Sequence, residues 1–334
     1  MSVGIRRIFS GIQPSGAAHL GNYLGALRQW AKLQSSSDSV LYSIVDLHSL
    51  TSLQAPLLLR ENILAMVTCL LACGVDPKKS IVFQQSQVSG HAELAWLLGC
   101  RTPMGWLNRM TQWKAKAMSD NTNVVGLGLF AYPVLQAADI LIYKASHVPV
   151  GEDQLQHLEL ARDIARSFNS AYNTQVFTEP QPLLGEVQRV MSLRNPLQKM
   201  SKSDNQDMTR INLTDSSDDI RNKIRKAVTD CTGSVTFDPH ERPGVSNLVS
   251  IFAAVSDSTP DKICRMFEGK QTVHLKDELA ELLISELAPI REEINRLQTD
   301  RGYVMDILRD GSERAREIAE PNLAEIKVLM GIKF

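Results

Sequence analysis

The sequence predicts an α/β fold, in which a parallel sheet with covering helices is followed by an all-helical C-terminal domain. Through about residue 205, apolar strand-like runs alternate with helical patterns, and from Ser216 onward the patterns are mostly helical. Strand–helix alternation is typical of parallel sheets, which bind ligands at the carboxyl ends of their strands. We therefore expect residues 1–205 to form the sheet domain and residues 206–334 the helical domain.

The individual elements follow from apolar periodicity and from turn residues. A β-like run at Arg7-Ile8-Phe9 leads through a turn-rich stretch to a helix that opens near Tyr23. Residues 40–49 predict a strand leading into a turn, and residues 80–86 predict another strand. Residues 116–128 are polar and contain glycine, so we expect a loop there. The remaining helical patterns cover 57–74, 91–100, 132–145, 155–168, 218–228, 245–255, 275–298 and 311–331.

Composition is that of an ordinary globular protein of 334 residues, with 43% hydrophobic and 22% charged residues. Because no apolar run reaches about 18 residues, membrane insertion is not expected. Five cysteines without a C-x-x-C pair argue against a metal or iron–sulfur site and indicate a reducing compartment. The net charge of −1 gives no support for a nucleic-acid partner. The short basic cluster at 221–226 has a simple explanation as a solvated helix face; its members are Arg221, Lys223, Arg225 and Lys226.

Two short segments carry phosphate-binding chemistry. The HLGN segment, His19-Leu-Gly-Asn22, follows a turn-rich loop and opens a helix, whose N-terminal N–H groups form an anion site. His19 and Asn22 are three residues apart, so they share one helix face. The KMSKS segment, Lys199-Met-Ser-Lys202-Ser, presents two ammonium groups beside hydroxyl groups. Each segment alone could be an ordinary helix start or an exposed basic loop, but together they indicate a polyphosphate site.

A third group of polar residues lies on one predicted helix. Tyr132, Gln136 and Asp139 are spaced i, i+4 and i+7, which places them on one face, and Pro133 suits a position near the helix start. Asp139 is surrounded by apolar residues, where an unpaired carboxylate is costly. Its partner is either internal, such as Lys144 or a backbone N–H, or a donor on a bound substrate.

Two further positions leave their alternatives open. Gly151 permits close approach of a ligand to the backbone, and Glu152 and Asp153 precede a helical run. Those two acids have a simpler explanation as helix caps. His48 is either a ligand-binding residue or a hydrogen-bonded core histidine.

Beyond these features, the chain resembles the class I aminoacyl-tRNA synthetases, and within them the tryptophanyl-tRNA synthetases of the bacterial and mitochondrial type. The resemblance extends from about Ile8 to Gly331 and runs in the family's order. It is carried by residues 9–27, 43–51, 132–141, 148–160, 190–204 and 243–248. It implies a Rossmann-like nucleotide-binding domain followed by a helical domain that reads the tRNA anticodon.

The resemblance implies a tryptophan site in which Asp139 accepts the indole N–H. Tyr132 and Gln154 would hold the α-amino group, and Gln136 stands where many bacterial relatives have methionine. The residues implied to line the ring or carboxylate side are Phe9, Gly11, His48, Val148 and Val150. A site built around a substrate N–H rejects analogues that lack it by large factors.

The implied ATP site combines both signatures with the loop before the helical run. Val190 would lie near adenine, and the loop at Gly151 near the ribose. Its full set is Gln13, Pro14, Ser15, Gly21, Asn22, Gly151, Glu152, Asp153, Val190, Lys199, Met200, Ser201, Lys202 and Ser203. The implied catalytic residues are His19, Asn22, Lys199 and Lys202.

The implied reaction is ATP-dependent activation of L-tryptophan to an adenylate, followed by transfer to tRNA(Trp). The chain shows no convincingly spaced nucleophilic triad, so positioning and charge stabilisation would supply the rate. Mg²⁺ would accompany ATP through its phosphates, which requires no dedicated metal ligands. Closure of the two domains would bring the KMSKS lysines onto the pyrophosphate after ATP binds.

Two departures and three alternatives accompany the resemblance. Asn22 replaces the usual final histidine of the class, as in other tryptophan enzymes. Residues 100–116 match loosely, which puts a phosphate role for Lys114 in doubt. The alternatives are a tyrosyl-tRNA synthetase, a catalytically silent paralogue and a small nucleotidylyltransferase. The intact HLGN and KMSKS segments, the SGIQPSG opening and the long helical extension argue against them.

The expected partners are tRNA(Trp), L-tryptophan and ATP, with a second copy in a homodimer, and neither membrane nor DNA. Only eight residues precede Phe9, which leaves no room for a transit peptide. Several stretches nevertheless look most similar to animal mitochondrial enzymes. We therefore expect the mitochondrial matrix, with a bacterial cytoplasm as the alternative.

Overall fold

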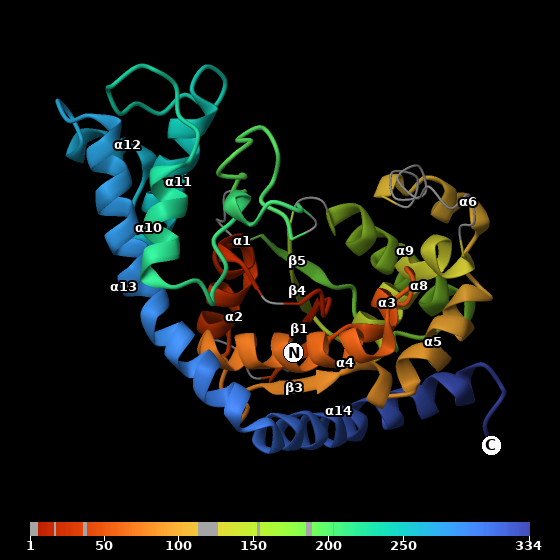
Figure 1. Ribbon diagram of the computed structural model, residues 1–334. Helices are drawn as coiled ribbons and strands as arrows, with labels where there is room; N and C mark the ends of the chain where they lie inside the picture. The colour runs from red at the N-terminus through yellow and green to blue at the C-terminus, as the bar shows by residue number, and fades with distance from the viewer. Residues whose placement is uncertain are drawn as a thin grey trace.

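A five-stranded parallel sheet lies at the centre of the protein, as the computed structural model in Figure 1 shows. The structure describes residues 6–16, 18–35, 39–112, 126–151, 154–184, 189–202 and 204–334. The strand order is β3-β2-β1-β4-β5, so the direction of winding reverses between β1 and β4. Open sheets of this kind bind ligands at the reversal point, beyond the carboxyl ends of the strands. The strands are β1 Arg7–Ile12, β2 Ser39–Ile44, β3 Ile81–Gln84, β4 His147–Val150 and β5 Gln181–Leu184.

The two faces of the sheet belong to two separate hydrophobic clusters. Ile8, Tyr42 and Val82 pack into one cluster, whereas Phe9 and Phe83 pack into the other. Successive side chains of a strand point to opposite faces, so neighbouring residues divide between the clusters. Both faces are therefore buried, as the apolar composition of the strands requires. The expected α/β class with a parallel sheet is confirmed.

Helices follow the strands and cover both faces. The helical segments are α1 Leu20–Asn22, η1 Tyr23–Leu27, α2 Arg28–Leu33, α3 Asp46–Ser49, α4 Pro56–Ala72, η2 Gln85–Gln87, α5 Gly90–Gly99, α6 Met104–Asn108, α8 Leu127–Leu141, α9 Leu155–Ala171, η4 Asp207–Thr209, α10 Ser217–Arg225, α11 Pro243–Val255, α12 Pro260–Met266, α13 Thr272–Thr299 and α14 Arg301–Leu329. The predicted strands at 7–9 and 80–86 and the predicted helices at 57–74 and 91–100 are confirmed, with small shifts at their ends. Of the strand and turn predicted over 40–49, the strand is confirmed as β2, and the short helix α3 follows it in place of a simple turn. Strands β4 and β5, with four residues each, carried too short an apolar signal to be predicted.

The placement of Pro133 near a helix start is wrong. Helix α8 begins at Leu127, so Pro133 lies inside it, on the seventh residue. Its buried face packs between α5 and α9, and this packing outweighs the lost backbone hydrogen bond that an interior proline causes. The predicted loop at 116–128 falls mainly on 113–125, which lie outside the described residues; α8 occupies its last two positions.

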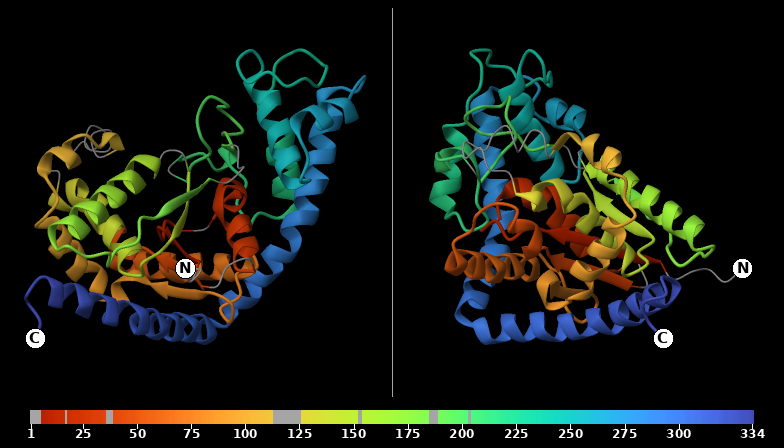
Figure 2. Two further views of the ribbon diagram at one scale, coloured as in Figure 1. Left: turned by 180° about the vertical axis from the view of Figure 1, so that it is seen from behind. Right: turned by 90° about the vertical axis from the view of Figure 1, so that its right-hand side faces the viewer.

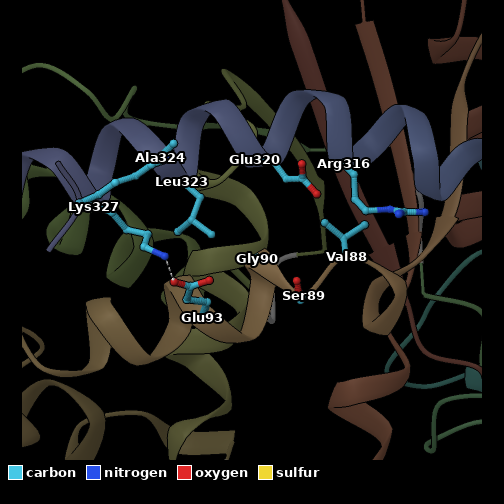
Figure 3. Close-up of a pocket in the computed structure, with 10 residues that line it drawn as sticks. Val88, Ser89, Gly90, Glu93, Arg316, Glu320, Leu323, Ala324 and Lys327 are labelled. Carbon is cyan, nitrogen blue, oxygen red and sulfur yellow. Dashed lines mark hydrogen bonds and ion pairs between the residues drawn. The ribbon is translucent and has the colours of Figure 1, made fainter.

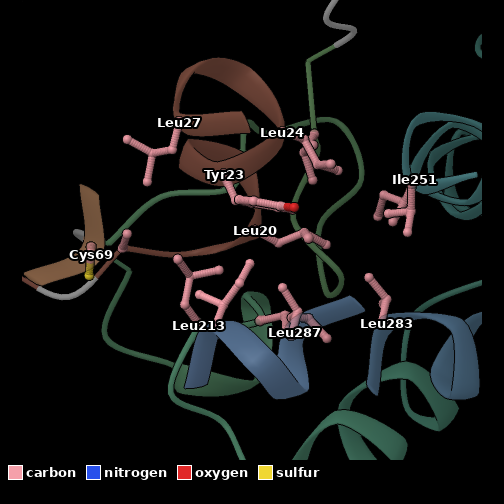
Figure 4. Close-up of a cluster of buried hydrophobic side chains, with 14 of the residues drawn as sticks. Leu20, Tyr23, Leu24, Leu27, Cys69, Leu213, Ile251, Leu283 and Leu287 are labelled. Atoms are coloured by element: carbon pink, nitrogen blue, oxygen red, sulfur yellow. The ribbon is translucent and has the colours of Figure 1, made fainter. Parts of the chain in front are cut away.

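Helices α11 and α13 pack on the helical segment that begins at the HLGN segment. Figure 4 shows Leu20 and Tyr23 of that helix facing Ile251 of α11 and Leu283 and Leu287 of α13. This cluster also contains strand residues of the sheet, so a single apolar core connects the sheet layer with α10, α11 and α13. The division into domains at residue 205 therefore stays a prediction.

Helix α14 returns to the sheet and covers its β3 edge (Figures 1 and 2). Gly311 lies against the backbone of this strand, where a Cβ atom would come within 1.9 Å of the Val82 carbonyl oxygen. Glycine is required there because only the missing side chain allows this approach. An uncovered edge strand invites pairing with other chains, so α14 protects the sheet. Among the described residues, no helix is long and apolar enough to cross a membrane.

Candidate active site

The HLGN segment forms the start of the helix that follows β1. His19 is the residue before α1, and its backbone N–H donates to Asn22 Oδ1 at 3.1 Å. The chain beyond the KMSKS segment holds this start in place, because Leu20 N donates to the Ile211 carbonyl at 2.8 Å and Leu213 N donates to the Ala18 carbonyl at 3.0 Å. The two signature regions are therefore joined by backbone hydrogen bonds.

The His19 imidazole is buried close to three cations. Burial, together with the nearby charges of Lys202, Arg210 and Lys199, lowers the pKa of His19 to about 4. At neutral pH this ring is uncharged, and among the described residues its Nδ1 has no hydrogen-bond partner. Gly21 lies directly against the ring, where a Cβ atom would be 3.0 Å from both Nδ1 and Cε1. His19 can thus donate a hydrogen bond to a phosphate oxygen but does not act as a cation.

The KMSKS segment pairs with the strand-like residues before it. Met200 is buried, and its N–H donates to the Val190 carbonyl at 3.0 Å. Helix α11 fixes the neighbouring residue, since Asn247 accepts from Met191 N at 2.9 Å and donates to the Met191 carbonyl at 3.0 Å. Lys199 and Ser201 are exposed on the same segment. The α11 residue Asn247 was not among the expected site residues, although the expected stretch 243–248 contains it.

Lys202 reaches across to the loop before the HLGN segment. Its Nζ donates to the Gly16 carbonyl at 2.7 Å and to Ser15 Oγ at 3.3 Å. Burial lowers the pKa of Lys202 to about 8, and the charge of Arg210 acts in the same direction. The structure therefore brings Lys202, His19 and Ser15 together from segments more than 180 residues apart.

The other expected ATP residues surround this point or lie outside the described residues. Gln13 and Ser15 are exposed and Pro14 is buried in the loop after β1. Gly151 is exposed after β4, the strand beside β1 across the reversal point of the sheet. Glu152, Asp153 and Ser203 lie outside the described residues, as does Lys114.

Asp139 lies at the centre of a buried polar network. Its Oδ2 accepts from His48 Nε2 at 2.8 Å, and its Oδ1 accepts from Gln85 Nε2 and His91 Nδ1, both at 2.7 Å. Burial by itself raises the pKa of Asp139, but the hydrogen bonds from His48 and His91 outweigh it and bring the pKa down to about 2. The carboxylate is therefore ionised and held by three donors.

This network excludes one of the partners that the sequence offered for Asp139, and it shows the surroundings of His48. Lys144 is not the internal partner of Asp139, because it forms an ion pair with Glu325 at 2.7 Å. Asp139 is instead paired with donors from α3, η2 and α5, which only the tertiary structure brings together. His48 is buried and hydrogen-bonded, and it also lies against the ring of Tyr132 at 6.3 Å between centroids.

The remaining expected pocket residues adjoin this network. Tyr132 is buried, with its hydroxyl 3.0 Å from His157 Nε2 of α9. Phe9 of β1 stacks on Tyr143 with 5.6 Å between the ring centroids, and the Tyr143 hydroxyl lies 2.8 Å from His91 Nε2. Val148 is buried; Val150, Gln136 and Gln154 are partly exposed, and Gly11 is exposed beside Val45.

Four residues of the network were not predicted from the sequence. They are Gln85, His91, Tyr143 and His157. Tyr143 follows an apolar run, whereas Gln85 lies among the polar residues Gln84, Ser86 and Gln87, so no common sequence signal identifies these residues or their partners.

The basic cluster at 221–226 is partly neutralised. Lys223 is buried and bonded to Asp207 and Asp215, each at 2.6 Å, so the expectation of a wholly solvated face is wrong for this residue. Its aliphatic stem packs inside the helical layer, and two carboxylates compensate its charge. Arg221 pairs with Glu281 at 2.7 Å.

Two cavities lie beside these segments rather than in them. One, of about 330 Å³, lies between Met191, Leu197 and the α11 residue Asn247. The other, of about 140 Å³, lies between the start of α5 and α14, where Figure 3 shows Lys327 bonded to Glu93 at 2.6 Å. Among the described residues, no cluster of three or more His, Cys, Asp or Glu could hold a metal ion.

Comparison with known proteins agrees with this geometry. Residues 4–288 match the family model described as tRNA synthetases class I (W and Y). The chain is 46% identical over 327 residues to the tryptophan–tRNA ligase of Rickettsia felis, with 98% of each chain covered. It is 44% identical over 344 residues to the mitochondrial tryptophan–tRNA ligase of Schizosaccharomyces pombe, with 98% of this chain and 95% of the relative covered.

Solved structures show the same likeness. The tryptophanyl-tRNA synthetase from Mycoplasma pneumoniae has a TM-score of 0.89 at 33% identity, with 98% of both chains covered. That of Campylobacter jejuni, complexed with ADP and tryptophan, has a TM-score of 0.81 at 34% identity, covering 97% of this chain and 99% of the other. A tyrosyl-tRNA synthetase from Aeropyrum pernix shares the fold at 20% identity and a TM-score of 0.68. This chain belongs to the class I tRNA synthetases of the W and Y family.

Proposed function

We propose that the protein activates L-tryptophan with ATP and transfers it to tRNA(Trp). The observation that carries the choice of amino acid is the ionised, buried Asp139, which is hydrogen-bonded to His48, whose ring lies against Tyr132. Phe9 adjoins this network through its stack on Tyr143. A fixed carboxylate is suited to the indole ring, which has one N–H donor and no acceptor. The relatives most similar over the full chain are named tryptophan–tRNA ligases, which favours the same substrate over tyrosine.

In the proposed site, Asp139 receives the indole N–H while Phe9, Gly11, His48, Val148, Val150 and Gln136 surround the ring and carboxylate. Tyr132 and Gln154 hold the α-amino group, which leaves the substrate carboxylate pointing toward the nucleotide. Phe9 and Gly11 lie in β1, Val148 and Val150 lie in β4, and Tyr132, Gln136 and Asp139 lie on α8; His48 belongs to α3, and Gln154 directly precedes α9. The reactants are then held in line, which can supply about 7–11 kcal/mol of the barrier.

The nucleotide would lie between the two signature segments. Val190 would lie at adenine, and the loop of Gly151, Glu152 and Asp153 would lie at the ribose. The phosphates and ribose would be lined by Gln13, Pro14, Ser15, Gly21, Asn22, Met200, Ser201 and Ser203. ATP enters with Mg²⁺ on its phosphates, because Mg²⁺ commonly binds through substrate oxygens with few protein ligands. The catalytic groups would be His19 and Asn22 as neutral donors and Lys199 and Lys202 as cations.

The proposed reaction has two steps, activation and transfer. A carboxylate oxygen of tryptophan attacks the α-phosphorus of ATP, the bond to the bridging oxygen breaks, and pyrophosphate leaves with both electrons. Lys199 and Lys202 would lie where charge develops on that leaving group. The 2′- or 3′-hydroxyl of the tRNA terminus then attacks the adenylate carbonyl and releases AMP.

The test is ATP–pyrophosphate exchange measured with each of the twenty amino acids, beside an Asp139→Asn variant. We expect exchange with tryptophan alone, reduced at least 100-fold in the variant, because the indole N–H loses its charged acceptor. Exchange with tyrosine would contradict the substrate and keep the enzyme class. Absence of exchange with every amino acid would contradict the enzymatic function altogether and favour a silent paralogue.

We propose further that residues 206–334 form the tRNA-binding domain and read the anticodon. The supporting observation is that α10, α11 and α13 stand to one side of the sheet while α14 alone returns beneath it (Figures 1 and 2). Arg225 and Lys226 remain exposed on this side. Replacing both by Glu should weaken tRNA charging at least tenfold and leave pyrophosphate exchange unchanged, whereas equal charging would contradict the assignment.

A homodimer is proposed on the basis of exposed apolar side chains. Leu50, Leu53 and Leu57 are largely exposed after α3 and at the start of α4, and Leu127 is exposed at the start of α8. Thr51 lies beside Gly128, where a Cβ atom would be 3.8 Å from its methyl group, so the segment after α3 adjoins the start of α8. Such patches mark protein contacts. Sedimentation should give a dimer that Leu53→Asp converts to a monomer; a monomeric wild type would contradict the proposal.

The proposed location is the mitochondrial matrix, with the bacterial cytoplasm as the alternative. The similarity to a mitochondrial relative supports the first, and similarity to bacterial relatives supports the second. Immunolocalisation in the source cells distinguishes them.

A further inference from the structure

The two oxygens of the Asp139 carboxylate are not equivalent. Oδ1 accepts from Gln85 and His91, whereas Oδ2 accepts from His48. A carboxylate oxygen has two lone-pair sites. Counting the donors that the described residues provide, Oδ1 is fully occupied and Oδ2 retains one acceptor site. A further donor that reaches this carboxylate would therefore be accepted by Oδ2.

Gln85 is fixed at both ends of its amide. Its Nε2 donates to Asp139 Oδ1, and its Oε1 accepts from the backbone N–H of Leu47 at 3.1 Å. The side chain is fully buried. Flipping the amide would break both bonds and bring its oxygen against the carboxylate, so the residue has one allowed orientation. It also links Asp139 to the helical turn that carries His48.

His91 is fixed in the same way. Its Nδ1 faces the Asp139 carboxylate and therefore carries a proton, and its Nε2 lies 2.8 Å from the hydroxyl of Tyr143. In the neutral ring Nε2 accepts from Tyr143, so the hydrogen bonds run in one direction from the tyrosine to the carboxylate. Tyr143 is fully buried and stacks on Phe9, the aromatic residue proposed to face the indole.

We propose that Gln85 and His91 are specificity-determining positioning residues, which hold Oδ1 so that Oδ2 faces the indole N–H. The terminal torsion of an aspartate is broad and roughly two-fold. Without two donors on Oδ1, the carboxylate turns and its free acceptor site leaves the plane of the indole. The preference for tryptophan over a ring that lacks an N–H then falls. This inference rests on the proposed function, since it concerns the same pocket.

The test compares two substrates in pyrophosphate exchange: tryptophan and β-(benzothiophen-3-yl)alanine, which carries sulfur in place of the indole N–H. The measured quantity is the ratio of their kcat/KM values, which a general loss of stability does not change. We expect the wild type to prefer tryptophan at least 100-fold. Gln85→Met, which keeps the length of the side chain but removes its donor, should lower this preference at least tenfold.

His91 provides a matched pair of variants. His91→Leu removes both hydrogen bonds and should lower the preference at least tenfold. His91→Asn places an amide N–H where Nδ1 stood, so it should keep the preference within about threefold of the wild type. If His91→Leu does not fold by circular dichroism, Gln85→Met and His91→Asn still decide the question.

Three outcomes would overturn the inference or its basis, and they are distinguishable. An unchanged ratio in Gln85→Met, with both substrates weakened equally, would show that Gln85 has only a structural role. If the wild type activated both substrates equally, the pocket would not recognise the indole N–H, and the proposed contact with Asp139 would be wrong. A wild type that activates no amino acid would refute the proposed function before any variant is compared.

Discussion

Lys202 provides the sharpest test of how the two signature segments work together. It is the residue that physically connects them, with its Nζ on the Gly16 carbonyl at 2.7 Å and on Ser15 Oγ at 3.3 Å. It also lies close enough to His19 to lower the pKa of that imidazole. We expect Lys202→Met, which keeps the stem and removes the charge, to slow the activation step while leaving tryptophan binding intact.

The magnitude follows from the position of the charge. Removing one preorganised donor to a developing oxyanion costs about 2.7–4 kcal/mol, or roughly 100- to 1000-fold in rate. Lys202 is on the nucleotide side of the site, and no contact connects it with the Asp139 network among the interactions of the described residues. The KM for tryptophan should therefore stay within about threefold of the wild type, and the loss should appear in kcat.

The pKa of Lys202 adds a second, independent signature. Because burial lowers it to about 8, the free enzyme loses this charge as the pH rises through 8. The kcat/KM for ATP reports the free enzyme, so it should fall above about pH 8. Lys202→Arg keeps a charge at all relevant pH values, and it should remove this alkaline limb even if its activity is lower.

Pyrophosphate exchange across pH 6–10, with ATP and tryptophan varied separately, measures all of these quantities. Thermal melting of each variant controls for folding. The reasoning would be refuted if Lys202→Met raised the KM for tryptophan and left kcat unchanged. It would also be refuted if the alkaline limb persisted near pH 8 in Lys202→Arg.

Three further predictions concern packing and protonation. Gly311→Ala should lower the free energy of unfolding by about 3 kcal/mol or more, because its Cβ would meet the Val82 carbonyl at 1.9 Å. The control Gly302→Ala, in the same helix, should be neutral or slightly stabilising. Equal effects of the two variants in urea unfolding would contradict this prediction. Gly21→Ala should displace the His19 ring, raising the KM for ATP and lowering kcat at least tenfold in exchange assays, and an unaffected enzyme would exclude the ring from the site. Unfolded His19 binds a proton near pH 6.5 and folded His19 near pH 4, so the unfolded state binds more protons between these values. The free energy of unfolding should therefore fall by about 3 kcal/mol as the pH is lowered from 6.5 to 4, and His19→Asn should remove that part of the loss.

Much of the fold could be predicted because local patterns and tertiary packing agree. The apolar runs of β1, β2 and β3 are buried on both faces, and the helix of residues 56–72 ends just before Gly74, as its sequence indicates. The errors arise where packing outweighs local preference. Pro133 sits inside α8 because that helix is held between two others, and Lys223 is buried because Asp207 and Asp215 compensate its charge.

The sequence by itself identified the candidate phosphate-binding segments and the pocket candidates of this protein. Backbone N–H groups at a helix start and lysines on a short segment are local features, so the HLGN and KMSKS segments are visible without a structure. The isolation of Asp139 among apolar residues is likewise a local feature, and it correctly indicated a carboxylate that needs a partner.

Only the tertiary structure decided which groups meet. The partners of Asp139 come from three separate elements, because the carboxyl ends of parallel strands converge at one edge of the sheet. Tertiary packing also brings Lys202 to Ser15 across 187 positions of the chain. Burial then sets the protonation states of His19, Lys202 and Asp139, since the cost of a buried charge depends on neighbours that are distant in sequence.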